Sequence, residues 1–175
     1  MKAIIFPGQG SQKAGMASQF HSNFKIVKDI FERTDQALKF SLSKIILNGS
    51  DDDLKKTEIT QPAILMTSFA IFSVLKQEFN FDISKIKYIA GHSLGEYSAL
   101  VSSGSISLED GVNLVHERGK LMQAAVPEGE GAMLAVMGVE VNELNSLLKQ
   151  SKVKEGFCEI ANDNSPGQII LSGRK

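Results

Sequence analysis

The sequence predicts an α/β fold built on a parallel sheet and followed by a smaller α+β unit. Three observations support this: apolar runs that enter helical segments through Gly-rich turns, a Gly-x-Ser-x-Gly turn at residues 91–95, and a change of pattern after Val126. The 175 residues, 42% hydrophobic and 22% charged, are enough for one core with a small appendage.

The composition excludes several classes of protein. Lys and Arg number 19 against 20 Asp and Glu, so no charge excess favours nucleic acid or an acidic membrane surface. The one cysteine, Cys158, excludes an intrachain disulfide and fits a reducing compartment. The longest largely apolar stretch, residues 63–75, is too short to span a bilayer. We therefore expect a cytoplasmic protein that contacts neither nucleic acid nor membrane.

The N-terminal residues 3–6 form a continuous apolar run, which is typical of a fully buried parallel strand. In the loop that follows, Gly8 and Gly10 flank Gln9, so the backbone can approach another group closely. A dinucleotide-binding fingerprint is excluded because Lys13 stands where its third glycine belongs and no second strand with an acidic end follows. A plain surface turn is the alternative for this loop.

Helical segments come next. Residues 20–40 carry a core-facing stripe at helical spacing, made of Phe24, Val27, Ile30, Phe31, Thr34 and Leu38. Residues 50–56 have the charge of an exposed loop. Pro62 marks the start of a buried helix over residues 63–79, and residues 80–87 link it to the next strand.

The Gly-x-Ser-x-Gly turn is entered from an apolar run (Ile86, Tyr88, Ile89, Ala90) and left through a helix over residues 96–103. Strand, tight turn and helix in this order are typical of a nucleophile elbow. Ser93 would then stand at a helix N-terminus, where backbone N–H groups favour developing negative charge. We predict that Ser93 is a nucleophile; the alternative is an ordinary strand–helix connection with a capping serine.

A helix over residues 107–125 should follow, with Ser107 as its N-cap and Asp110 completing an imperfect capping box. The Gly-rich, polar residues 127–131 then mark a boundary, so we expect domains over residues 1–126 and 127–175.

The second domain reads as strand, helix, strand and strand, which is three-quarters of a small α+β unit. The segments are residues 132–139, 141–150, 157–162 and 168–172, with a turn at residues 165–167 between the last two.

A serine nucleophile needs a base that takes its proton. His92 directly precedes Ser93, so its side chain should point away from the hydroxyl, and we expect it to pack nearby instead. His21 and His116 lie in predicted helices, where a lone histidine is usually a surface or core residue. The sequence therefore offers no convincing base.

Arg118 lies three residues after Val115 and three before Leu121, at the edge of an apolar helical stripe. A guanidinium in such a place favours a bidentate anionic partner. The alternative is a structural ion pair with one of the nearby acids, Glu117, Glu128 or Glu96.

Five motifs, in this order, resemble those of the malonyl-CoA:acyl-carrier-protein transacylases of fatty-acid synthesis. They are residues 6–12, 60–63, 91–99, 118–123 and 164–168, and the resemblance runs from end to end of the chain. It implies a hydrolase-like three-layer parallel-sheet core and a small ferredoxin-like subdomain, both incomplete here. It also implies ping-pong acyl transfer from malonyl-CoA to the phosphopantetheine thiol of acyl carrier protein. No metal and no bound cofactor are implied, since the coenzyme A thioester is a substrate.

The resemblance also assigns roles to residues. Ser93 would form the malonyl ester and Arg118 would grip the malonyl carboxylate, while the backbone N–H groups of Gln9 and Leu94 would form the oxyanion hole.

The remaining assignments concern substrate binding. Gln61 and His92 would line the acyl pocket, and Asn162 and Asn164 would lie near the pantetheine or nucleotide cleft.

Members of this family continue well beyond the length of this chain, and the part that would follow carries their catalytic histidine. We therefore expect the chain to correspond to the N-terminal part of such an enzyme and to be inactive alone. A serine esterase or thioesterase, and a catalytically dead fragment that binds carrier protein, are the alternatives. Unpaired sheet edges would favour self-association. The sequence leaves open whether the pathway makes fatty acids or polyketides.

Overall fold

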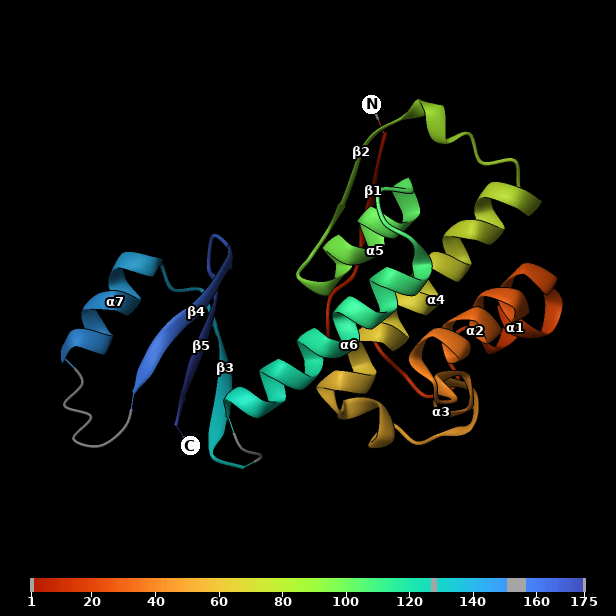
Figure 1. The fold of residues 1–175 in the computed structure, drawn as a ribbon. Helices are drawn as coiled ribbons and strands as arrows, with labels where there is room; N and C mark the ends of the chain where they lie inside the picture. Colours follow the sequence, from red (N-terminus) through yellow and green to blue (C-terminus); the bar gives the residue numbers. More distant parts are fainter. Residues whose placement is uncertain (1, 127–128, 151–156, 175) are drawn as a thin grey trace. The chain divides into compact units, whose positions relative to one another are not determined.

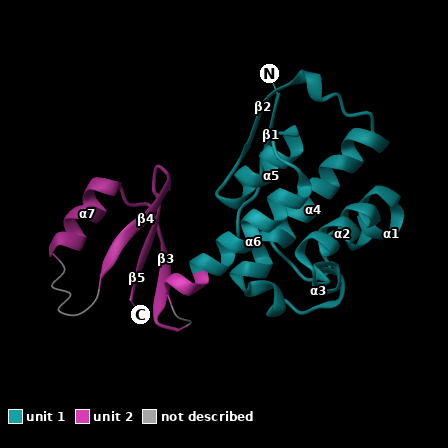
Figure 2. Ribbon diagram, viewed as in Figure 1, with its two compact units in different colours: residues 1–122 teal, residues 123–175 magenta. Residues whose placement is uncertain are grey.

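The computed structural model of the chain describes residues 2–126, 129–150 and 157–174. It separates into two compact units, residues 1–122 and 123–175, which Figures 1 and 2 show. The predicted boundary after Val126 lies four residues beyond this division. Pro127 and Glu128 of the predicted hinge lie outside the described residues.

The sheet of the first unit consists of β1 (Lys2–Phe6) and β2 (Ile86–Gly91), which pair in parallel as predicted. One face of this sheet carries Phe6 and the partly buried Ile4 and Ile89. These side chains pack against Phe72 and Ala99, which come from the helices α4 (Thr57–Glu78) and α5 (Leu94–Ser103). The α/β class is therefore confirmed.

The opposite face of the same sheet is open in the described residues. Ile5 is 75% exposed and Tyr88 is 54% exposed. The prediction that β1 is fully buried is wrong, because side chains alternate along a strand and only Ile4 and Phe6 face the helices. The layered core is thus incomplete on this side.

The predicted helix over residues 20–40 is two helices, α1 (Ser18–Asn23) and α2 (Lys25–Leu38). The chain is extended at Phe24, with φ −122° and ψ 123°, and this breaks the helical hydrogen bonding. The predicted stripe is otherwise buried, with Phe24 itself only partly covered. A short helix that the sequence did not predict, α3 (Leu42–Asn48), follows and also packs into the core.

Helix α4 begins at Thr57, six residues before the predicted start, so Pro62 lies inside the helix instead of at its beginning. By length and composition α4 is the one helix in the described part of the chain that could cross a membrane, which corrects the shorter apolar stretch read from the sequence. Most of its residues from Thr60 to Val74 are buried inside the first unit. Such burial is what a core helix of a globular unit shows.

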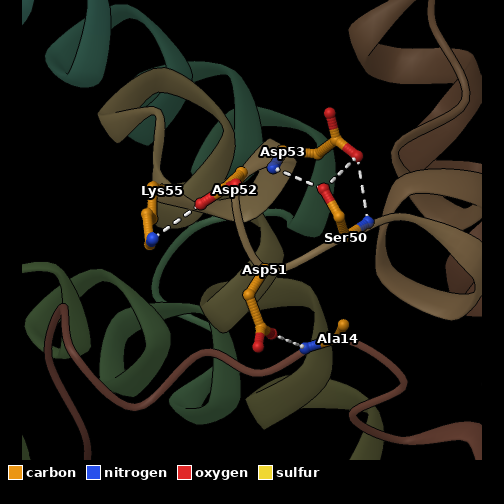
Figure 3. A network of polar contacts seen from close by, with 6 residues as sticks. All are labelled: Ala14, Ser50, Asp51, Asp52, Asp53 and Lys55. Carbon is orange, nitrogen blue, oxygen red and sulfur yellow. Dashed lines mark hydrogen bonds and ion pairs between the residues drawn. The ribbon is translucent and has the colours of Figure 1, made fainter.

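The charged residues 50–56 are more than an exposed loop. They contain a short 3-10 helix, η1 (Asp53–Lys55), whose Leu54 is completely buried in the core of the first unit. The carboxylate of Asp51 accepts a hydrogen bond of 2.8 Å from the backbone N–H of Ala14, and so ties this turn to the segment after the Gly-rich loop (Figure 3).

Helix α5 ends at Gly104, which adopts a φ of 78°, and α6 (Leu108–Ala125) follows after a short turn. The predicted cap of α6 is confirmed. Ser107 Oγ accepts a hydrogen bond of 3.0 Å from the backbone N–H of Asp110 and donates to the Asp110 carboxylate at 2.7 Å.

The second unit has the predicted order of strand, helix, strand and strand. Its elements are β3 (Gly131–Met137), α7 (Val141–Gln150), β4 (Cys158–Ser165) and β5 (Gln168–Arg174). The strands form an antiparallel sheet in the order β3-β5-β4. Leu144 of α7 packs on Ile169 and Leu171 of β5, which gives this unit a small core of its own.

Candidate active site

The end of β2 and the start of α5 form a sharp turn centred on Ser93. Its backbone has φ 54° and ψ −113°, a conformation that residues with a side chain rarely adopt. Strain of this kind costs about 1–3 kcal/mol and is retained mainly at functional sites. The Ser93 side chain is exposed at the N-terminus of α5.

Two glycines allow this turn to close. A Cβ added to Gly91 would lie 2.0 Å from the backbone of Gly95, and a Cβ added to Gly95 would lie 2.4 Å from the carbonyl oxygen of Phe6. No side chain fits at either position, so the Gly-x-Ser-x-Gly pattern has a steric cause here. Leu94 is the first residue of α5, and helix geometry leaves its N–H without an intrahelical acceptor.

The Gly-rich loop after β1 lies directly against the elbow. The backbone N–H of His92 donates to the carbonyl oxygen of Phe6 at 3.1 Å. A Cβ added to Gly8 would lie 2.7 Å from Nδ1 and 2.9 Å from the backbone oxygen of His92. The structure thus brings the Gln9 loop next to the elbow, as the predicted oxyanion hole requires. The side chain of Gln9 turns toward α4, where Nε2 lies 3.5 Å from Thr57 Oγ1.

Arg118 of α6 joins the elbow to α4. One guanidinium nitrogen donates to Ser93 Oγ at 2.8 Å, and the other terminal nitrogen donates to Gln61 Oε1 at 2.5 Å. Gln61 is completely buried, and its Nε2 donates in turn to the sulfur of Met122 at 3.4 Å. Three of the predicted site residues, Ser93, Gln61 and Arg118, therefore meet although they lie far apart in the sequence. We call these three residues and Met122 the site network.

No carboxylate pairs with Arg118 among the residues that the structure describes. Glu117 forms its ion pair with Lys120, at 2.8 Å, and Glu96 has no ion pair within that part of the chain. Glu128, the third acid considered, lies outside it. The guanidinium has five N–H donors, and the two bonds just described are both to neutral groups. Such a cation can bind an anion at the serine hydroxyl.

Arg118 is positioned by a close approach of α6 to the first turn of α4. A Cβ added to Gly119 would lie 2.5 Å from Cα of Glu58 and 2.7 Å from the carbonyl oxygen of Thr57. His116 Nδ1 lies 2.8 Å from the carbonyl oxygen of Glu58. Sequence reasoning missed this junction. The signal that could have found it is a glycine inside a helix, next to a functional side chain.

Two of the three histidines have structural surroundings. The ring of His116 lies 5.4 Å from that of Phe40, and the ring of His21 lies 5.2 Å from that of Phe31. Both the backbone and the imidazole of His92 lie against Gly8 of the Gly-rich loop, although the residue as a whole is exposed.

Asn162 and Asn164 lie on β4 of the second unit, and both are exposed. Asn162 faces Ile170 of β5, between two irregularities in the register of the strands. The predicted place of these two residues near a pantetheine or nucleotide cleft stays a prediction. No group of three or more His, Cys, Asp or Glu residues that could hold a metal ion occurs in the described segments.

Comparison with known proteins places this geometry in a family. The chain matches the acyl transferase domain family over residues 3–175. It is 43% identical over 173 residues to the malonyl CoA-acyl carrier protein transacylase of Haemophilus influenzae, an alignment that covers 99% of this chain and 54% of that protein. The chain therefore spans about half the length of the curated relatives it matches.

Solved structures agree with this. The acyl-carrier-protein-S-malonyltransferase of Bartonella henselae has 43% sequence identity and a TM-score of 0.91, with 99% of this chain and 55% of that chain covered. A malonyl-transacylase solved in complex with its type II PKS acyl-carrier protein has 40% identity and a TM-score of 0.88, with the same coverage. The elbow, the site network and these similarities agree: the chain belongs to the acyl transferase domain family.

Proposed function

We propose that the chain forms the nucleophile-bearing half of an enzyme that transfers malonyl groups from malonyl-CoA to acyl carrier protein. One observation carries the proposal: the Arg118 guanidinium touches the Ser93 hydroxyl and lacks a carboxylate partner within the described residues. A dicarboxylic acyl group bound as an ester on Ser93 would bring its free carboxylate within reach of that guanidinium. The relatives named above are malonyl transacylases, which supports the same acyl group.

The reaction has two symmetrical steps. In the first, Ser93 Oγ attacks the thioester carbonyl carbon of malonyl-CoA, the carbon–sulfur bond breaks, and the coenzyme A sulfur leaves with the proton taken from the serine. In the second, the phosphopantetheine thiol of the carrier protein attacks the serine ester, and the proton returns to Ser93. The N–H groups of Leu94 and Gln9 would stabilise the oxyanion that forms in each step.

Arg118 would select the acyl group. A guanidinium binds a carboxylate through two parallel N–H···O bonds, and such charge-assisted bonds are about twice as strong as neutral ones. A malonyl carboxylate would take over the donors that now point at Ser93 and Gln61, whereas an acetyl group has nothing to offer them. An esterase or thioesterase needs no such anion clamp, which disfavours that alternative. Gln61 and His92 would line the acyl pocket, and Asn162 and Asn164 the route of the pantetheine.

Several parts of this proposal depend on the rest of the enzyme. Neither His21 nor His116 has surroundings that suit a base for Ser93, and the second half of the family's length would supply one. The chain alone should therefore not turn over. The carrier protein as partner, the absence of a bound cofactor and a cytoplasmic location stay predictions, as does the choice between fatty-acid and polyketide synthesis.

Acylation of Ser93 tests the proposal directly. An enzyme that carries this chain together with its second half is incubated with malonyl-CoA, or with a fluorophosphonate that reacts with activated serines, and the adduct is located by peptide mass spectrometry. We expect one adduct, on the peptide containing Ser93, and none in Ser93→Ala. A label on another serine that persists in Ser93→Ala would refute the assignment.

A further inference from the structure

Helix α4 has an internal proline, and the structure shows how the missing hydrogen bond is replaced. Pro62 has no N–H, so the carbonyl group of Glu58, four residues earlier, lacks its usual helical donor. His116 Nδ1 of α6 lies 2.8 Å from that carbonyl oxygen. A carbonyl oxygen can only accept a hydrogen bond, so Nδ1 of His116 must carry the proton.

The bond lies beside the site network on both helices. On α6, His116 and Gly119 are one turn apart, and both contact the first turn of α4 while Arg118 stands between them. On α4, Gln61 directly precedes Pro62 and accepts the hydrogen bond from Arg118. The His116–Glu58 bond therefore completes the hydrogen bonding of the α4 turn that carries Gln61, the residue to which Arg118 donates.

We propose that His116 is a positioning residue, which supplies the donor that Pro62 removes from α4 and thereby holds Arg118 in place for the acyl carboxylate. Its effect on malonyl selectivity rests on the proposed function, whereas its effect on the position of Arg118 does not. His116 touches neither substrate nor Ser93 in this role.

Two matched substitutions separate the donor from the volume of the side chain. His116→Asn places an amide N–H at the position of Nδ1, and His116→Leu has the same shape as asparagine without a donor. A third substitution, Pro62→Ala, gives α4 back its own backbone donor to Glu58. If the proposal holds, His116→Leu should be harmful alone and nearly harmless when combined with Pro62→Ala.

The first measurement is the nuclear magnetic resonance signal of the Arg118 guanidinium N–H groups in the chain, assigned with Arg118→Lys. We expect a slowly exchanging signal in the parent and in His116→Asn, its loss in His116→Leu, and its return in the variant that also has Pro62→Ala. A nitrogen-15 spectrum of His116 should show the proton on Nδ1. Should His116→Leu fail to fold, the comparison of leucine with asparagine is made in the Pro62→Ala background, where the two should be equal.

The second measurement uses an enzyme that carries this chain together with its second half, and it is the ratio of malonyl to acetyl adduct on Ser93 after incubation with equal amounts of the two coenzyme A esters. His116→Leu should lower this ratio about two- to tenfold, which is the range that one lost hydrogen bond allows. A variant that loses stability but keeps both the Arg118 signal and the ratio would show that His116 is merely structural. If the parent form of that complete enzyme gives no adduct on Ser93, the proposed function fails, and the Arg118 signal alone decides the role of His116.

Discussion

Two polar networks in the first unit differ in whether their charged side chains have charged or hydrogen-bonding partners that satisfy them within the protein. The first, which we call the Ser50 turn, comprises residues 50–55 and is shown in Figure 3. Most of its contacts are local, and all are exposed: Asp53 accepts from the backbone and side chain of Ser50 at 2.9 and 2.8 Å, and Lys55 pairs with Asp52 at 2.6 Å. Asp53 and Lys55 have these partners within three residues, and Asp51 bonds to the backbone N–H of Ala14.

The site network is built in the opposite way. It joins the elbow, α4 and α6 through Ser93, Gln61, Arg118 and Met122, and its central amide is fully buried. A single cation lies in it beside neutral groups. A carboxylate at position 61 would pair with the Arg118 guanidinium within the protein. The chain has the neutral amide of Gln61 at that position. The comparison indicates that the charged groups of the Ser50 turn have their partners within the protein, while the site network keeps a positive charge available.

Removing the cation should produce the largest effect. In an enzyme that carries this chain together with its second half, we expect Arg118→Ala to reduce malonyl transfer far more than acetyl transfer. Arg118 is half-buried here. If the second half of the enzyme covers the site, loss of the charge-assisted bidentate bond should cost about 2–5 kcal/mol, or roughly 30-fold to several thousandfold in rate. The measurement is kcat/KM for the two coenzyme A esters.

The control for this experiment is Arg33→Ala. Arg33 lies in an exposed ion pair with Glu109, at 2.7 Å, so the substitution removes an arginine that already has a carboxylate partner. It should leave the ratio of malonyl to acetyl transfer unchanged. Equal losses for both acyl groups in Arg118→Ala would show that Arg118 is structural.

Supplying the missing acid should have the next largest effect. Gln61→Glu has nearly the same shape and would place a carboxylate beside the terminal nitrogen of Arg118 that now donates to Oε1. The new pair would compete with a malonyl carboxylate, and we expect about a tenfold to 100-fold loss of malonyl adduct on Ser93 with the fold retained. Gln61→Leu is the matched control, because it removes the amide and leaves the cation free. An equal loss in both variants would contradict the competition.

The parts of the site that are local in sequence were predictable. The glycines at 91 and 95 announce the elbow because the same steric clash forbids a side chain wherever this turn occurs. Helical periodicity placed Arg118 beside an apolar stripe and so indicated an anionic partner, but it could not show that Gln61, 57 positions earlier, would meet it. That contact depends on how two helices cross.

Tertiary contacts also decided the errors. Proline favours the first turn of a helix, so the sequence predicts a helix start at Pro62, yet a donor from another helix allows the proline inside α4. Strand β1 has the apolar run of a buried strand, but Ile5 is exposed because the described residues supply packing partners on one face only. Neither the donor from α6 nor the packing partners of β1 can be predicted from the local sequence.

The smallest effect is expected in the Ser50 turn, where acid should weaken a network that is otherwise complete. Hydrogen bonds from Ser50 lower the pKa of Asp53 below the ordinary value of 3.8. The bond from the backbone N–H of Ser50 has the larger effect, and the bond from its hydroxyl has the second largest. An acid whose pKa is lowered on folding stabilises the fold at pH values above its unfolded pKa, and this stabilisation is lost as the pH falls through the folded pKa. Asp53→Asn should therefore destabilise the chain at pH 7 and have progressively less effect below about pH 4.

Ser50→Ala separates the two causes, because it removes the hydroxyl and keeps the backbone donor. Carbon-13 titration of the Asp53 carboxyl should give a midpoint below 3.8 in the parent and a slightly higher one in Ser50→Ala, still below that value. The free energy of unfolding in urea, measured at pH 7 and pH 3, should fall more between these two pH values in the parent than in Ser50→Ala. Because Asp53 is fully exposed, solvent screens the interaction and the change should be small. A parent midpoint at or above 3.8 would show that the carboxylate does not hold these bonds in solution, and the contrast between a satisfied and an unsatisfied network would then rest on the site network alone.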